Sequence, residues 1–375
     1  MKKTFLFLMA AVMATACQND DTDFSAYING SNEDGTTTSV NTIYINYSDN
    51  SVTVTGDTNG YVTTSGADVT VSTGTDADSL LLVLSGSTSD GSLLVFRQKK
   101  YGIRLNGVSI CNLNGAAINN QCGKALYLEV ADGTVNTLTD GTSYAEQAYD
   151  QKGTLFSEGQ IFFSGTGSLT VTGSTKHAIA CDDYIVIDEG TVTATTSTGS
   201  AVKANDGLWI NGGTLDFSTT ADGGRGIRCD STVVVTGGNT TISTSGNCKI
   251  ESVDGVADTT SAACIKCDYA FTMSGGTLAM TSSGDGGKGI SCNQAITVSG
   301  GTFTAKTTGS NNIGKPKAVK SDTAIIVSGG SFTATVNKSW ACDNGTDSDT
   351  PADRLTIVGT PTSQSIAKRA VTVIF

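Results

Sequence analysis

Residues 226–230 read Gly-Ile-Arg-Cys-Asp, and the pattern returns as Gly-Ile-Ser-Cys-Asn at 289–293 and Ala-Val-Lys-Ser-Asp at 318–322. Further copies begin at Ala178, Ala201 and Cys264. Their acidic or amide positions mostly follow one another at intervals of 21 to 29 residues, and one gap of 38 residues holds an insertion around residues 247–262. A repeat of this length indicates a solenoid, in which each coil is stable only when it is stacked on its neighbours.

Glycine pairs keep the same rhythm, and apolar residues alternate with polar ones on both sides of each pair. Val233 and Val235 precede one pair, and Phe303 and Ala305 follow another. Alternation with period two predicts two short strands per coil, and the Ile-x-Cys line supplies a third, with Ile227 inward. We therefore predict an all-β, right-handed, single-stranded parallel β-helix with coils of about 25 residues. A β-sandwich would not carry the same residue types at one offset in every repeat.

Stacking turns each repeat position into a column. One inner column is predicted to hold the residues Ile179, Val202, Ile227, Ile265, Ile290 and Val319, and the next Cys181, Ala204, Cys229, Cys267, Cys292 and Ser321. Nine cysteines remain when Cys17 is set aside, from a total of ten, and they lack the spacing of a zinc site. We interpret them first as buried packing residues, and disulfides stay possible.

The ends of the chain suggest closure of the solenoid. Residues 43–47, 51–55 and 68–72 alternate as strands of an N-terminal cap, and residues 354–358 and 370–374 are expected to close the other end. We divide the chain into a signal peptide with a lipidation cysteine at 1–17, an acidic linker with cap strands at 18–60, and the β-helix at 61–375.

The first residues predict export. Lys2 and Lys3 precede an apolar stretch too short to span a bilayer, and Ala14-Thr-Ala-Cys17 resembles a lipoprotein cleavage and lipidation site. An ordinary secretory signal is the alternative. The acidic run at 18–21 resembles a surface-export signal, or is a solvated linker. We expect an outer-membrane lipoprotein at the cell surface, held by lipid on Cys17 alone and monomeric.

The net charge excludes some partners. It is −12, and becomes −14 when Lys2 and Lys3 are removed with the signal. An acidic chain without a basic tail repels nucleic acid and anionic lipid, so neither is expected to bind.

Two columns of basic side chains are candidates for binding a ligand. The first holds Lys203, Arg228, Lys266 and Lys320, which could pair with the carboxylates of an acidic polysaccharide or could instead neutralise neighbouring aspartates. A shorter row, expected to be solvent-exposed, comes three residues earlier and holds His177, Arg225, Lys288 and Lys317.

The acidic column beside them offers oxygen ligands. Stacked carboxylates repel unless something neutralises them, and Asp182, Asp183, Asn205, Asp206 and Asp230 could together bind calcium. The alternative is that they make turns and hydrogen-bond along an Asn/Asp ladder.

Several stretches resemble a known family. They include Arg104-Leu-Asn-Gly-Val-Ser109, residues 131–141 and the Asp-Gly-Gly-x-Gly-Ile lines at 222 and 285. These resemble carbohydrate-binding domain-containing proteins built as pectate-lyase-like β-helices, over roughly residues 61–336. The resemblance implies binding of cellulose or acidic sugars, with calcium as a cofactor. The family's usual Asp-Asp-Gly is here Asp-Gly-Gly, which puts individual metal sites in doubt.

The leading hypothesis is non-catalytic, calcium-assisted binding of an acidic or cellulosic polysaccharide such as polygalacturonate. A polysaccharide lyase is the enzyme alternative, in which Arg228 or Lys203 beside Asp182 and Asp230 would act in β-elimination. Repetition argues against one singled-out base. The third hypothesis is an adhesive or structural surface protein, which would bind no soluble glycan.

Overall fold

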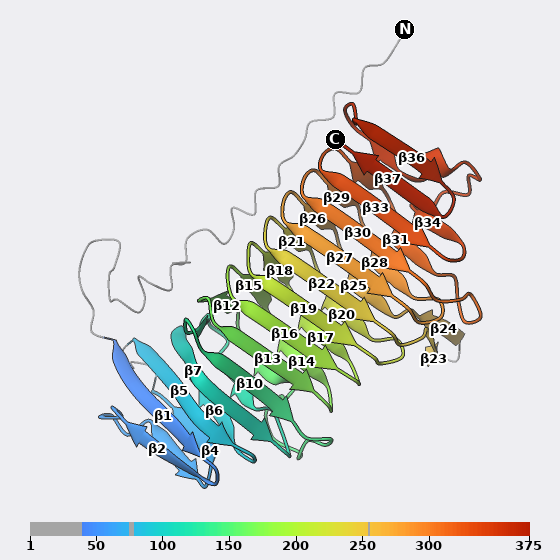
Figure 1. Ribbon diagram of the computed structural model, residues 1–375. Coiled ribbons are helices and arrows are strands. Elements are labelled where there is room, and N and C mark those ends of the chain that lie inside the picture. Colours follow the sequence, from blue (N-terminus) through green and yellow to red (C-terminus); the bar gives the residue numbers. More distant parts are fainter. Residues whose placement is uncertain (1–39, 75–78, 254–255) are drawn as a thin grey trace.

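The computed structural model describes residues 40–74, 79–253 and 256–375, and these form one solenoid of stacked β coils (Figure 1). The predicted signal peptide and Cys17 lie outside the described residues. No helix among the described residues is long and apolar enough to cross a membrane. The parallel β-helix predicted from the repeat is confirmed.

One side of the solenoid is a 12-stranded sheet built from the Ile-x-Cys lines. Its strands are, in order, β3 (Val62–Ser65), β4 (Asp68–Ser72), β6 (Ser92–Phe96), β8 (Ile118–Asn120), β11 (Gly153–Ser157), β14 (His177–Cys181), β17 (Ser200–Ala204), β20 (Arg225–Cys229), β25 (Ala263–Cys267), β28 (Lys288–Cys292), β31 (Lys317–Ser321) and β34 (Trp340–Asp343).

The remaining coil strands belong to a 23-stranded sheet that runs in two rows. The first row holds β1 (Asn41–Ser48), β5 (Leu80–Thr88), β7 (Tyr101–Asn112), β9 (Leu126–Val130), β12 (Ile161–Ser164), β15 (Tyr184–Ile187), β18 (Gly207–Ile210), β21 (Val233–Val235), β26 (Phe271–Met273), β29 (Ile296–Val298), β32 (Ile325–Val327) and β35 (Thr356–Ile357). The second holds β10 (Val135–Asp140), β13 (Ser168–Gly173), β16 (Thr191–Thr196), β19 (Thr214–Thr219), β22 (Asn239–Thr244), β27 (Thr277–Ser282), β30 (Thr302–Thr307) and β33 (Ser331–Val336).

Glycine makes the turn between the two rows. Gly238 lies between β21 and β22 with φ +73°, and a Cβ there would lie 2.5 Å from the carbonyl oxygen of Gly212 in the preceding coil. Only a residue without a side chain fits this turn at the spacing of stacked strands.

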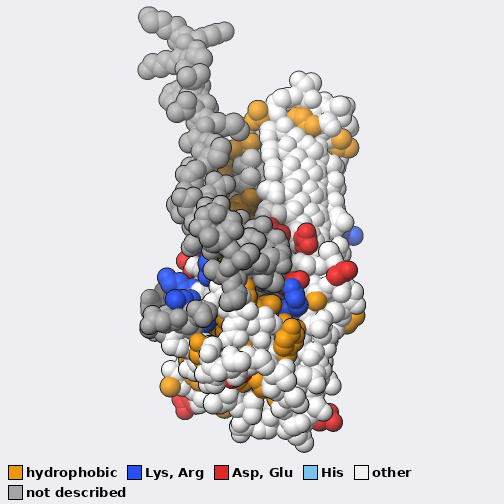
Figure 2. Space-filling view, turned by 90° about the vertical axis from the view of Figure 1, so that its left-hand side faces the viewer, with side chains coloured by type: hydrophobic (Ala, Val, Ile, Leu, Met, Phe, Trp, Pro, Cys, Tyr) orange, Lys and Arg blue, Asp and Glu red, His pale blue; other side chains and the backbone are white. Residues whose placement is uncertain are grey.

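Figure 2 shows the side of the solenoid at the left of Figure 1, where few charged side chains are visible on the upper part.

The predicted inner columns are confirmed by the register. Ile179 pairs with Val202, and the column continues through Ile227, Ile265 and Ile290 to Val319. These side chains are at most 1% exposed. Burial of one such apolar side chain contributes about 1.5–3 kcal/mol to folding, so the stacked columns form the core.

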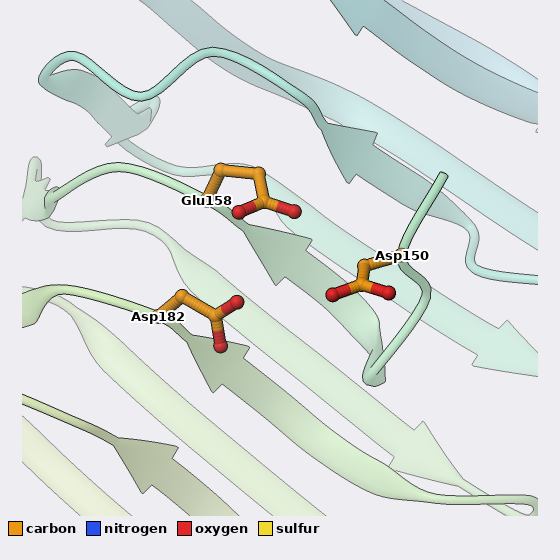
Figure 3. Close-up of side chains that lie close together, drawn as sticks. All are labelled: Asp150, Glu158 and Asp182. Atoms are coloured by element: carbon orange, nitrogen blue, oxygen red, sulfur yellow. The ribbon is translucent and has the colours of Figure 1, made fainter. Parts of the chain in front are cut away.

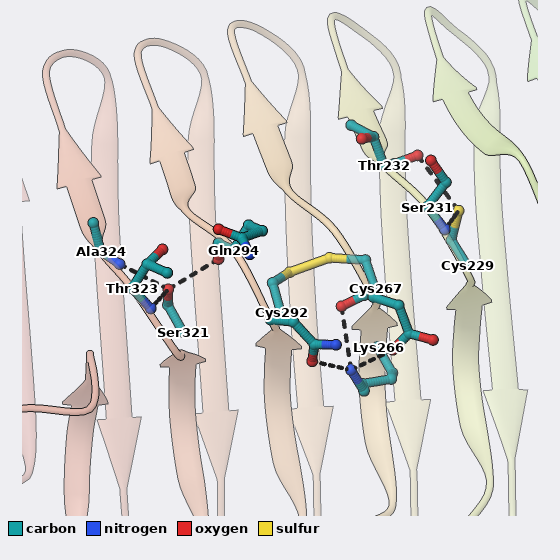
Figure 4. The surroundings of a disulfide bond; sticks show 12 residues. Cys229, Ser231, Thr232, Lys266, Cys267, Cys292, Gln294, Ser321, Thr323 and Ala324 are labelled. Atoms are coloured by element: carbon teal, nitrogen blue, oxygen red, sulfur yellow. Dashed lines mark hydrogen bonds and ion pairs between the residues drawn. A yellow bond between two sulfur atoms is a disulfide. The ribbon is translucent and has the colours of Figure 1, made fainter.

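The cysteine column contains one covalent link. Cys229, Cys267 and Cys292 occupy the same position in three successive coils, and a disulfide joins Cys267 to Cys292 while Cys229 stays free (Figure 4). Cys181 is also a free, buried residue. The interpretation of the cysteines as buried packing residues is confirmed for most of them, and the open question of disulfides is resolved for this pair.

Antiparallel strands close both ends of the solenoid. β2 (Ser51–Thr55) pairs antiparallel with β1, and β3 does so with β4. At the other end β37 (Ala370–Ile374) pairs antiparallel with both β33 and β36 (Ser363–Ala367), as Figure 1 shows. β1 already pairs in parallel with β5, so parallel stacking begins before residue 61, the boundary that we drew from the sequence.

The insertion in the long gap is a hairpin. β23 (Lys249–Val253) pairs antiparallel with β24 (Val256–Thr260) and forms a separate two-stranded sheet between β22 and β25. The single 3-10 helix of the described chain is η1 (Pro351–Arg354), after β34.

Candidate functional site

The outer surface of the 12-stranded sheet from β17 to β31 carries two columns of basic side chains, and we call it the basic face. In the first column Lys203, Arg228, Lys266, Ser291 and Lys320 stand in direct register on successive coils. Their neighbours Ile227 and Cys229 point into the core, so alternation directs the basic side chains outward.

The second column of the basic face holds Ser200, Arg225, Ala263, Lys288 and Lys317, also in register. The expectation that this row is solvent-exposed is wrong, because Lys317 is only 7% exposed and Arg225 and Lys288 are partly buried. The acidic column follows the ends of these strands and contains Asp230, Asp268 and Asp322. The two basic columns hold seven cations in total, against these three carboxylates.

Each cation of the first column has an acidic partner. Arg228 Nε lies 2.9 Å from Asp230 Oδ1, and Lys203 Nζ lies 3.5 Å from Asp230 Oδ2 in the next coil. The pairs Lys266–Asp268 and Lys320–Asp322 are 2.6 and 2.7 Å long. From the sequence, these cations could pair with carboxylates of a polysaccharide or neutralise neighbouring aspartates. In the structure, which contains no ligand, they pair with the aspartates.

These pairs also set the ionisation of Asp230. Burial opposes ionisation of its carboxyl, but the hydrogen bond from Arg228 and the charges of Arg228 and Lys203 outweigh it and hold the pKa of Asp230 below its ordinary value. Asp230 is therefore a firmly ionised partner of two cations, which leaves little reason for it to bind a metal ion.

A groove of about 300 Å³ runs beside the basic face. The β23–β24 hairpin forms one wall with Lys249 and Glu251, and Lys203, Arg225 and Arg228 form the floor. Arg225 Nε is buried there without a hydrogen-bond partner. An unsatisfied buried donor costs about 1–3 kcal/mol, so an anion that reached it would recover that cost.

His177 borders the same groove and is neutral at neutral pH. Its Nδ1 accepts a hydrogen bond from the Ser200 N–H at 2.9 Å, so its proton lies on Nε2. Burial, followed by the charge of Lys203, lowers its pKa to about 4. His177 can donate one hydrogen bond into the groove, but it adds no charge at pH 7.

Burial also changes the pKa of Lys288, which stands in the second column of the basic face. It is largely enclosed and donates a hydrogen bond to Ser261 Oγ. Burial, together with the charges of Lys320, Lys317 and Arg225, lowers the pKa of Lys288 to about 8. Burial likewise lowers the pKa of Lys317, the next residue of the same column, although its hydrogen bond to Asp343 opposes this.

Among the described residues, the carboxylates that lie close enough together for one metal ion are Asp150, Glu158 and Asp182, and we call them the acid cluster (Figure 3). One oxygen of each lies within 4.8 Å of the others, and the side chains come from a loop and from the ends of β11 and β14. Burial, followed by the charge of Asp182, raises the pKa of Glu158. Lys152 pairs with Asp150 at 2.8 Å and also with Asp182.

The residues predicted to bind calcium are only partly brought together. Asn205 Nδ2 donates to Asp182 Oδ1 at 3.4 Å. Asp183 accepts hydrogen bonds from Gln160 and from the Tyr184 N–H instead. Within the described part of the chain, Asp183, Asp206 and Asp230 join no group of three acidic ligands. The calcium assignment stays a prediction, and Asp150, which the sequence reasoning missed, lies in a loop outside the repeat.

The fold and this surface define a parallel β-helix protein with a charged outer face. The chain belongs to the carbohydrate-binding domain-containing protein family, whose model matches residues 65–225 and 219–312.

A relative and a solved structure are similar to parts of the chain. A carbohydrate-binding domain-containing protein of Acetivibrio thermocellus is 31% identical over 118 residues, which are 30% of this chain and 41% of that protein. The chain thus matches less than half of the relative's length. A gadolinium derivative of the polysaccharide lyase-like protein from C. thermocellum has a TM-score of 0.57 and 22% identity, covering 68% of this chain and 96% of that one. At this identity the likeness shows the fold alone.

Proposed function

We propose that this protein binds an acidic, polygalacturonate-like polysaccharide along the basic face without cleaving it, at the cell surface to which a lipid on Cys17 would anchor it. One observation carries the proposal: two registered columns of cations on a chain whose net charge is −12. Membership of the carbohydrate-binding domain-containing family supports it.

The ion pairs of the basic face do not prevent such binding. Exposed ion pairs contribute only about 0–1 kcal/mol each, so Arg228 can exchange Asp230 for a ligand carboxylate at small cost. Because Lys203, Arg228 and Lys266 follow one another at about 4.8 Å along the sheet, a polyanion meets several cations at once. Many weak contacts on one chain add up to useful affinity.

Calcium assistance is assigned to the acid cluster. Three carboxylates supply the hard oxygen ligands that calcium prefers, and calcium would have to displace Lys152 from Asp150 and Asp182. Asp182→Asn should abolish calcium binding measured by isothermal titration calorimetry. Asp206→Asn, which removes an equal charge from an exposed residue outside the cluster, should leave it unchanged; equal losses in both variants would refute this site.

A polysaccharide lyase is the second candidate, and the lowered pKa of Lys288 favours it because part of its amine is neutral near pH 8. The distance from the acid cluster opposes it. Asp182 follows β14, four strand steps and about 19 Å from β28, too far for calcium there to acidify a proton that Lys288 removes. Accumulation of unsaturated product, read by ultraviolet absorbance with polygalacturonate and calcium, would favour the lyase.

The test of binding compares two triple variants of equal charge. Lys203→Ala, Arg228→Ala and Lys266→Ala together should abolish retardation in gels that contain polygalacturonate. Lys99→Ala, Lys124→Ala and Lys306→Ala remove three exposed cations outside the basic face and should retain it. Retardation that is equal in both variants would contradict the proposal, and no retardation of the wild type on any polysaccharide would favour the adhesive or structural alternative.

A further inference from the structure

A second basic cavity lies at the C-terminal end of the 12-stranded sheet, beyond the basic face, and we call it the terminal pocket. Its volume is about 510 Å³. It is built from the loop before β31 with Lys317 of that strand, from β34 with the turn that follows, from Arg354 of η1, and from the turn of the β36–β37 hairpin, which supplies Lys368. β34 is the last strand of the 12-stranded sheet, whereas the β36–β37 hairpin follows the repeated coils.

Trp340 continues the second column of the basic face into this pocket. It stands in register with Lys317, which stands in register with Lys288. Ser339 before it has φ +75° and is one of two non-glycine residues with positive φ among the described residues. Such a conformation costs about 1–3 kcal/mol and is retained where the surroundings require it.

The ring of Trp340 holds two cations. The guanidinium carbon of Arg354 lies 4.0 Å from the ring centroid, and Lys368 Nζ lies 4.4 Å from it. Cation–π contacts of this kind orient a cation without neutralising it. Because Arg354 and Lys368 lie over the ring of Trp340, the ring is not free to stack against a neutral sugar. The pocket is therefore better suited to an anionic group.

The charge of the pocket is unbalanced. Lys317 and Arg354 share Asp343, at 2.5 and 2.8 Å. Lys315 and Lys368 form no ion pair with any described residue. Four cations thus line the pocket with two carboxylates, Asp343 and Asp347, for a net charge of +2. Arg354 Nε is buried without a hydrogen-bond partner, which adds a donor that an anion can satisfy.

We propose that the terminal pocket binds the carboxylate of a uronate sugar of the same polysaccharide chain that lies along the basic face. This inference rests on the proposed function. Five strand steps, about 24 Å at about 4.8 Å per step, separate β17 at the groove from β34 at the pocket. A ligand long enough to reach both sites gains the avidity of two linked contacts, and a shorter one does not.

The experiment measures Kd by isothermal titration calorimetry for galacturonate oligomers of increasing length. For wild-type protein, affinity should rise by about 100-fold once the oligomer spans both sites. Lys315→Ala with Lys368→Ala should remove this rise while short oligomers keep their affinity. Both side chains are exposed, so the fold is retained, and Lys124→Ala with Lys306→Ala is the control of equal charge.

The outcomes separate the pocket from the proposed function. A rise in affinity that the pocket variant keeps would overturn the pocket while leaving binding on the basic face intact. Affinity that does not depend on oligomer length in the wild type would overturn it as well. Absence of binding for every oligomer would overturn both the proposed function and the pocket.

Discussion

The outer surface of the 12-stranded sheet carries opposite charges on two strands that are built alike. At β14 the carboxylate of Asp182 meets those of Asp150 and Glu158. Two coils further, at β20, the equivalent Asp230 is held by Arg228 and Lys203. Both strands place an Ile and a Cys in the core at the same positions. The backbone therefore fixes where each side chain points, and the outward positions are free to carry either charge.

The largest effect that we expect is on stability, and it comes from a disulfide that the basic region contains and the region of the acid cluster lacks. The Cys267–Cys292 disulfide closes a segment of 25 residues in the basic region, whereas Cys181 near the acid cluster is free. Replacing Cys267 and Cys292 by Ser should lower the free energy of unfolding by about 3 kcal/mol, measured by denaturant titration. Hydrogen exchange should show the loss centred on β25 and β28.

Cys181→Ser is the control for that prediction. Its sulfur lies within hydrogen-bond distance of the Gly159 and Tyr184 carbonyl oxygens, which a serine hydroxyl can also reach. We expect a much smaller loss, and a loss as large as that of the disulfide variant would show that the column contributes by packing alone.

The next effect concerns pH and the basic face. Because the pKa of Lys288 is about 8, a bound polyanion favours its charged form, and binding takes up a proton above that pH. Affinity for polygalacturonate should fall as pH rises from 7 to 9, by up to about tenfold if the ligand raises the pKa by about one unit.

Lys288→Arg keeps its charge over this range and should remove that decline in affinity. Isothermal titration calorimetry at pH 7 and pH 9 compares the two proteins. The groups that titrate or carry charge around Lys288 are Cys248, Lys317, Lys320 and Arg225. A decline that persists in the arginine variant would contradict the assignment of the pH dependence to Lys288.

The smallest effect that we expect is the change in stability when Glu158 of the acid cluster is replaced. The folded pKa of Glu158 is raised, so the folded protein holds this proton more tightly than the unfolded chain does. The favourable contribution is present at low pH and is lost as pH rises through the raised pKa. Without calcium at pH 7, Glu158→Gln should therefore stabilise the protein, by at most about 1 kcal/mol.

Thermal unfolding with and without calcium measures this effect. The same substitution removes one proposed calcium ligand, so calcium should stabilise the variant less than it stabilises the wild type. A variant that is less stable than wild type at pH 7 without calcium would mean that Glu158 is held by attraction to Lys152 rather than repelled by Asp182.

The sequence predicted those parts of the molecule that repeat. Ile227 and Cys229 recur at one offset, which was enough to place them in the core and Arg228 outside it. The repeat could not select a disulfide, because Cys229, Cys267 and Cys292 are equivalent neighbours along one column. Which two of them bond depends on local geometry that the spacing does not contain.

The parts that sequence reasoning missed lie in segments that occur once. Asp150 lies in a loop, and Trp340 in β34 contacts Arg354 of η1 and Lys368 of the hairpin turn; no periodicity indicated where these segments lie. Lys317 was expected to be exposed because it stands near a turn, but it pairs with Asp343, which follows Trp340 on the last strand of the sheet, and is only 7% exposed. Contacts between a repeat and a single insertion are therefore visible only in three dimensions.

The antiparallel hairpin at the C-terminal end has a consequence for assembly. A stack of parallel strands ends in unpaired backbone N–H and C=O groups, which another stack could extend without limit. β37 covers the edge of β33 with a strand of opposite direction, and β36 adds a short exposed edge beyond it. The edge of β33 is thereby closed within the chain itself, so a parallel strand of another molecule cannot extend this row of the solenoid there.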